Sequence, residues 1–75
     1  MAEQFARKAV SYFRGTQSPK FQADAYCDLA EVLEAAGRRE EAVVAWNEAL
    51  DRYERKGVVP LARRVRERLA SVQPV

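Results

Sequence analysis

The sequence predicts an all-α fold of four antiparallel helices in a single domain over residues 1–75. Two observations predict it. Ala, Glu, Arg and Leu, all strong helix formers, dominate the composition, and apolar residues recur at helical spacing in four separate segments. The expected helices cover residues 2–14, 19–36, 39–56 and 60–71. The connections between them are short, which favours antiparallel neighbours.

The boundaries of the first two expected helices follow from residues that stop and start helices. Gly15 follows the first helix, at the position where a left-handed cap favours glycine. Ser18 precedes Pro19, which is typical of an N-cap residue followed by proline in the first helical turn. The apolar residues of the first helix, at 3.6-residue spacing, are Phe5, Ala6, Ala9, Val10 and Phe13. One side of this helix is therefore expected to be buried.

The last two expected helices are bounded in a similar way. Gly37 ends the second helix and Gly57 ends the third. The third helix begins with acidic residues, which suit the positive end of its dipole. Pro60 opens the fourth helix, because proline is tolerated in the first helical turn.

The composition leaves few residues that could carry out chemistry. The chain of 75 residues has one cysteine, Cys27, and no histidine. It therefore lacks a set of ligands for zinc, haem or an iron–sulfur cluster. It can form no disulfide within the chain, and it has no Ser-His or Cys-His pair that could act as a nucleophile. Asp24 and Asp28 are spaced as a carboxylate pair, but without histidine or a phosphate loop they are a poor basis for acid–base catalysis. We expect neither an enzyme nor a cofactor.

Charge is divided between two parts of the chain. The net charge is +2, yet the charged residues of 21–37 are all acidic and amount to −4, whereas residues 52–68 hold seven basic and two acidic residues, a net of +5.

No apolar run approaches the roughly 20 residues of a membrane-spanning helix, and the N-terminal residues lack the apolar stretch of a signal peptide. The lone cysteine fits a reducing compartment. We expect a cytoplasmic protein without a membrane partner.

Residues 23–56 show a regular pattern of large and small side chains. The pattern is a large residue, Leu with a small residue, glycine at the helix turn, and small-large-small on the next helix: Tyr26, Leu29, Ala30, Gly37, Ala42, Trp46 and Ala49. Small residues let two helices approach closely, and the large ones fill the space beside them. The pattern resembles a tetratricopeptide repeat, although Glu54 stands where that repeat usually has proline. The resemblance implies one complete helix pair.

The flanking segments extend this resemblance. ARKAVSYF resembles the second helix of a preceding repeat, and VVPLARRVRERLA resembles the solvating helix that closes such arrays. The whole chain is also similar to the C-terminal ends of large bacterial signalling proteins, which join a cyclase or transcription-regulator head and an ATPase to helical repeats. This second similarity implies that Met1 begins a small paralogue or an excised fragment.

The resemblance implies a protein-interaction module whose concave face is lined by the first helix of the pair. The residues placed there are Asp24, Cys27, Asp28, Glu31, Glu34 and Ala35. One interpretation is an acidic groove for a basic protein or peptide segment. The alternative is a charged helix face that only keeps the chain soluble. Binding of a chaperone's C-terminal carboxylate is disfavoured, because the family uses Lys, Asn and Arg for it.

A basic cluster in the last expected helix includes Arg63, Arg64 and Arg68. It could contact phosphates of nucleic acid, but no aromatic residue interleaves with it, which disfavours this partner. It could also be a solvated end helix, or meet the acidic groove of a second copy.

A homodimer is the other alternative that the sequence leaves open, because about two repeats are fewer than such arrays normally need. An open apolar face is expected beside Phe5, Val10 and Phe13.

Overall fold

The computed structural model describes residues 2–15 and 18–72, and within them it contains four helices and no strand. The helices are α1 (Ala2–Arg14), α2 (Pro19–Ala35), α3 (Arg39–Lys56) and α4 (Val59–Val72). The all-α prediction with four helices is therefore confirmed. No helix in these residues has the length and apolar character needed to cross a membrane.

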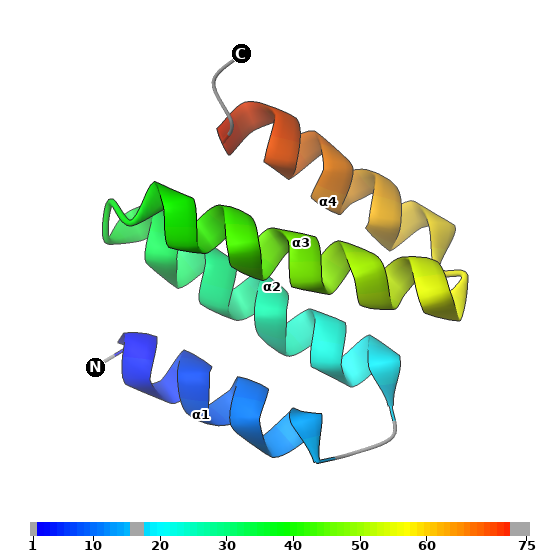
Figure 1. Cartoon of the computed structure of the whole chain (residues 1–75), viewed down its shortest axis with the longest axis horizontal. Coiled ribbons are helices and arrows are strands. Elements are labelled where there is room, and N and C mark those ends of the chain that lie inside the picture. Colours follow the sequence, from blue (N-terminus) through cyan, green and yellow to red (C-terminus); the bar gives the residue numbers. More distant parts are fainter. Residues whose placement is uncertain (1, 16–17, 73–75) are drawn as a thin grey trace.

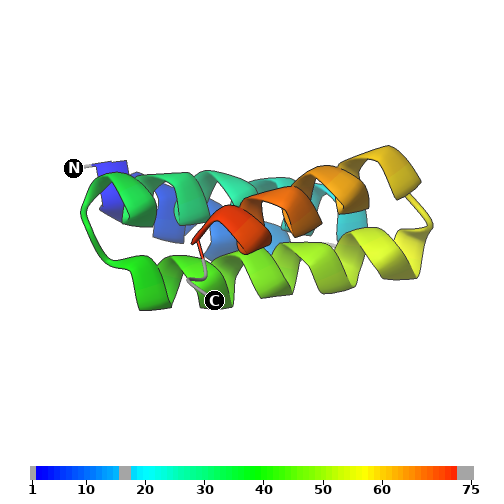
Figure 2. The same cartoon turned by 90° about the horizontal axis from the view of Figure 1, so that it is seen from above.

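The four helices form a flat array in which each runs antiparallel to the one before it (Figure 1). The array measures 32 × 29 × 14 Å along its principal axes. Figure 2 shows α2 and α4 on one side of the array and α3 on the other, so that α3 bridges its two neighbours.

The core is densest where α2 packs against α3. Four alanines there are completely buried: Ala23, Ala30, Ala42 and Ala49. Their small side chains permit close approach of the two helices, and larger buried side chains fill the space around them: Tyr26, Leu29, Leu33, Trp46 and Tyr53. On either side, α1 contributes Ala6 and Val10 to the same core, and α4 contributes Ala62, Val65, Leu69 and Val72.

Three helix ends differ by one residue from the expected boundaries. Helix α2 ends one residue earlier than expected, and α4 begins one residue earlier and ends one residue later. Helix α2 ends at Ala35, because the N–H groups of Gly37 and Arg38 turn back to the carbonyls of Glu34 and Leu33. Helix α4 begins at Val59 rather than at residue 60, since proline at the second position of a helix costs no hydrogen bond. The Ser18 N-cap is confirmed: its Oγ accepts a hydrogen bond from the Phe21 N–H at 3.5 Å.

The prediction of a left-handed cap at Gly15 is wrong. Among the described glycines only Gly37 and Gly57 have positive φ, at 78° and 79°. The Gly15 N–H instead donates to the Tyr12 carbonyl at 3.2 Å in a simple turn. At Gly37 and Gly57 the next helix follows almost at once, so the chain must reverse within a few residues.

The apolar face of α1 is also composed differently from the prediction. Phe5 is 70% exposed, but Val10 is buried against the core, so placing Val10 on an open face is wrong. Tyr12 is the second exposed aromatic residue of α1, and it is 71% exposed. Phe13 is half-buried and contacts the rings of Tyr12 and Phe21, with centroids 5.1 and 5.8 Å away. The exposed face of α1 is therefore aromatic.

Replacing Gly37 by alanine tests the requirement for a left-handed residue. Gly37→Ala should lower the free energy of unfolding by about 1 kcal/mol, because a Cβ atom is strained at positive φ. Gly15→Ala is the matched control and should cause no such loss, since Gly15 lacks positive φ. Urea unfolding followed by circular dichroism measures both, and equal losses in the two variants would contradict the assignment.

Candidate functional site

A groove of about 390 Å³ lies between α2, α3 and α4. Residues from all three helices line it: Cys27 and Glu31 from α2, Trp46 and Tyr53 from α3, and Leu61, Arg64, Val65, Glu67 and Arg68 from α4. Figure 2 shows α2 and α4, which supply its two walls, on the same side of α3. These residues are far apart in sequence, and the antiparallel order of the helices brings them together.

The floor of the groove is apolar and aromatic. Trp46, Tyr53 and Val65 line the groove but belong to the buried core, and each is only 3% exposed. Leu61 and Cys27 are half-buried beside them. The half-buried Leu61 and Cys27 therefore supply most of the apolar surface that a bound side chain could remove from water.

Glu34 links all three helices at one end of the groove. The Trp46 indole N–H donates to Glu34 Oε2 at 2.5 Å, and the Arg68 guanidinium lies 3.3 Å from both carboxylate oxygens. The guanidinium also lies over the Trp46 ring, 5.4 Å from its centroid. The acidic and basic clusters of the sequence therefore meet within one chain. Glu34 holds α4 in place instead of being free for a partner.

A second set of linked hydrogen bonds involves residues nearer the N-terminus of α2. The Tyr53 hydroxyl donates to the Asp24 carboxylate, and the Cys27 thiol donates to the Tyr53 oxygen at 3.8 Å. Burial, together with nearby acidic residues, raises the pKa of the Cys27 thiol to about 11. Burial and the bond to Asp24 also raise the pKa of Tyr53. Cys27 is thus a protonated, unreactive thiol at neutral pH.

Three charged residues that line the groove, Glu31, Arg64 and Glu67, remain without an ion pair in the described part of the chain, and the first two lie on opposite walls. Glu31 lies on α2 and Arg64 on α4. Glu67 also reaches the groove, but helical spacing puts it on the side of α4 opposite the buried Ala62 and Val65, at the outer rim. The walls therefore carry opposite charges above an apolar floor.

The structure divides the residues that the sequence placed at a site. Cys27, Glu31, Arg64 and Arg68 come together in the groove, with Asp24 and Glu34 bonded just beside it. The others are exposed and outside its lining: Asp28, Ala35 and Arg63.

Sequence reasoning missed three residues of the floor, Tyr53, Leu61 and Val65, and also Glu67 on the wall of α4. Tyr53 follows Trp46 by seven residues, which places both on the same side of their helix. This spacing could have indicated that Tyr53 lies beside Trp46 in the groove, with its hydroxyl bonded to a partner.

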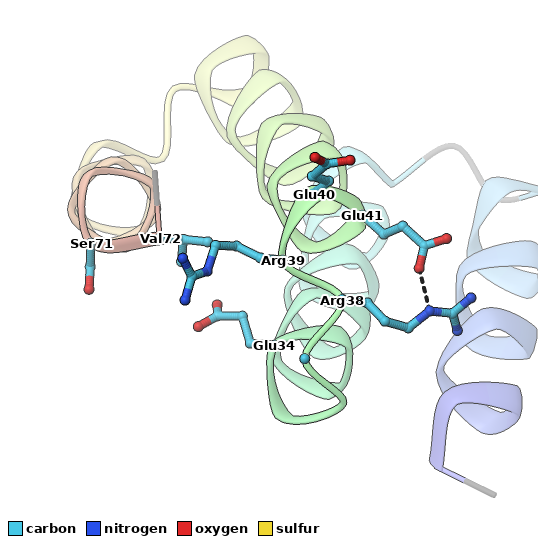
Figure 3. Close-up of a pocket in the computed structure, with 8 residues that line it drawn as sticks. Glu34, Arg38, Arg39, Glu40, Glu41, Ser71 and Val72 are labelled. Atoms are coloured by element: carbon cyan, nitrogen blue, oxygen red, sulfur yellow. Dashed lines mark ion pairs between the residues drawn. The ribbon is translucent and has the colours of Figure 1, made fainter. Parts of the chain in front are cut away.

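A second hollow lies at the end of the array where α2 joins α3, near the last turn of α4 (Figure 3). Of its charged residues, Arg38 contacts Glu41 at 2.6 Å and also Glu3, outside the lining, at 2.5 Å, whereas Arg39 and Glu40 form no ion pair within the described residues. Bonds from Arg7 and Arg38 lower the pKa of Glu3. Since this hollow lacks an aromatic floor, it is a weaker candidate than the groove. No group of metal-binding side chains occurs among the residues that the structure describes.

Removing the Glu34 carboxylate tests its structural role. Glu34→Ala should lower the free energy of unfolding by about 1–2 kcal/mol, because it leaves the buried Trp46 N–H without an acceptor. Glu31→Ala is the matched control on the same helix, and its effect should stay within about 0.5 kcal/mol, since Glu31 is exposed. Urea titration of both variants gives these values. A loss in Glu31→Ala as large as that in Glu34→Ala would show that the Trp46 bond is unimportant.

The reactivity of Cys27 tests its environment. At pH 8 the native chain should react with iodoacetamide about a hundredfold more slowly than the urea-unfolded chain, whose thiol pKa is the ordinary 9.0 rather than about 11. Because folding raises this pKa, the associated stabilisation is complete below pH 9 and is lost as the pH rises toward 11. Similar rates in the folded and unfolded chain would exclude the burial described above.

Comparison with family models, with curated protein sequences and with solved structures finds no match for this chain.

Proposed function

We propose that this chain is a non-catalytic protein-interaction module of the tetratricopeptide-repeat type, which holds a segment of a partner in the groove between α2 and α4. The observation that carries this proposal is the groove's composition: an aromatic and aliphatic floor between walls with the unpaired charges of Glu31 and Arg64. A concave, partly apolar surface can hold a side chain, and unpaired charges provide specificity.

The packing of residues 23–56 supports the family assignment. Six of the seven pattern residues are buried, namely Tyr26, Leu29, Ala30, Ala42, Trp46 and Ala49. The seventh, Gly37, has a φ of 78° in the turn between α2 and α3. Each residue thus meets the physical requirement that the repeat pattern places on it: close approach, space filling or chain reversal.

The chemistry of the groove supports a binding role over a catalytic one. Cys27 is protonated at neutral pH, and the carboxylates of Asp24 and Glu34 accept hydrogen bonds from Tyr53 and Trp46. Groups held in this way are poorly placed to act as nucleophile or base. A cytoplasmic location in a bacterial signalling protein suits the free Cys27 thiol and the resemblance of the chain.

Nucleic-acid binding by α4 receives less support. Two of its four arginines are engaged within the chain, Arg66 with Glu54 and Arg68 with Glu34. Arg63 and Arg64 remain, which is few for a phosphate-binding surface.

Position-specific photocrosslinking tests the groove as the binding site. A chain with p-benzoylphenylalanine in place of Glu31 should form a crosslinked product with a protein in a lysate of its native cells. The same residue in place of Asp51, which is exposed and lines neither the groove nor the second hollow, should not. Gel analysis and mass spectrometry identify the product. Equal crosslinking from both positions, or none from position 31, would contradict the proposal.

Self-association is a second candidate function, favoured by the exposed aromatic rings of Phe5 and Tyr12 on α1. Exposed aromatic residues on one face are typical of a contact surface. If α1 pairs two copies, the sedimentation coefficient should rise with concentration in the micromolar range. The double variant Phe5→Ser, Tyr12→Ser should abolish this rise, whereas Val44→Ser, at an equally exposed apolar position of α3, should preserve it. A chain that stays monomeric at high micromolar concentration excludes this function.

A further inference from the structure

We infer that the segment held in the groove is amphipathic in a specific way: an apolar side chain with a basic group on the α2 side and an acidic group on the α4 side. This inference rests on the proposed function and deepens it. It also departs from the expectation of a purely basic partner, which considered α2 alone.

The floor determines the apolar part of the partner. Trp46, Tyr53 and Val65, each 3% exposed, form its base, and the half-buried Leu61 adds aliphatic surface. The polar atoms of the two aromatic residues are already engaged, since the indole N–H donates to Glu34 and the hydroxyl to Asp24. The floor therefore offers a partner few free hydrogen-bonding groups, and an aliphatic or aromatic side chain fits it best.

The walls determine the charges of the partner. On α2, the exposed Glu31 has Asp28 one helical turn before it, and neither forms an ion pair within the described residues. The nearest base of α2, Lys20, is paired with Asp24 at 3.1 Å. This wall is consequently negative and favours a basic group.

The wall formed by α4 has the opposite character. Arg64 lines the groove without an ion pair in the described residues, and the Arg68 guanidinium lies one turn farther along, held by Glu34. Glu67 offsets part of this charge, but only from the outer rim. An acidic group of the partner is therefore favoured beside Arg64.

The two walls together discriminate against partners of a single charge. A purely basic segment that satisfies Glu31 places a like charge near Arg64, and a purely acidic segment places one near Glu31. Juxtaposed like charges disfavour binding, so the groove selects segments that carry both signs.

Selection from a library of random peptides displayed on phage tests this inference, with the full chain immobilised. Peptides enriched by the wild-type chain should contain an apolar residue with both a basic and an acidic residue near it. Arg64→Glu makes both walls acidic and should shift the enriched peptides to basic residues only. Glu31→Lys makes both walls basic and should shift them to acidic residues only.

Two controls separate the walls from the overall charge of the chain. Arg63→Glu and Asp51→Lys make the same changes of charge at exposed positions that line neither the groove nor the second hollow. Both should enrich the same peptides as the wild-type chain. Circular dichroism spectra of all variants should match that of the wild-type chain, which confirms that each is folded.

The affinity of one enriched peptide gives the size of the effect. Fluorescence anisotropy should show about a tenfold weaker Kd for Arg64→Glu and an unchanged Kd for Arg63→Glu, because only the first reverses the charge beside the acidic group. Peptides of one charge sign from the wild-type chain, or charge preferences that do not follow the wall substitutions, would overturn the inference and leave the proposed function standing. The absence of any enriched peptide would overturn the proposed function as well.

Discussion

The close packing of α2 on α3 is the constraint on which the rest of this structure depends. Alanines at the crossing are completely buried and let the two helices approach, but each covers little apolar surface. Larger side chains at the edges of the crossing must therefore supply most of the core. In this chain several of them are aromatic and have a polar atom, above all Trp46 and Tyr53. Burying these residues brings their polar atoms to the edge of the core, where each needs a partner.

The acidic residues of α2 meet that need, which links stability to the character of the groove. Glu34 accepts the Trp46 N–H and Asp24 accepts the Tyr53 hydroxyl, because an unsatisfied buried donor is costly. The same two carboxylates would otherwise be free for a partner. Arg68 then joins Glu34 and the Trp46 ring, and so fixes α4 beside α2. What is left to define binding is the pair of free charges on opposite walls, Glu31 and Arg64, above the apolar floor.

Much of the fold could be predicted because helix formation is local. Regular spacing of apolar residues indicated four helices, and Ser18 and Gly37 marked boundaries through hydrogen bonding and φ angles within a few residues of each. The left-handed conformation expected at Gly15 was wrong, because a glycine that follows a helix does not by itself determine the φ angle at which the backbone leaves the helix. Val10 was misjudged because its exposure depends on the position of α2, which spacing within α1 does not contain.

The candidate site could likewise be predicted only in part from the sequence. The sequence by itself determined which residues share a side of α2, since Cys27, Glu31 and Glu34 are spaced by three or four positions. It also determined that acidic and basic residues gather in different helices. Only the tertiary structure decided which of these charges are used within the chain and which stay free. Glu34 and Arg68 are 34 residues apart, and their contact depends on how α3 bridges α2 and α4. Ion pairing depends on distance in space, and helical periodicity sets distances only within one helix.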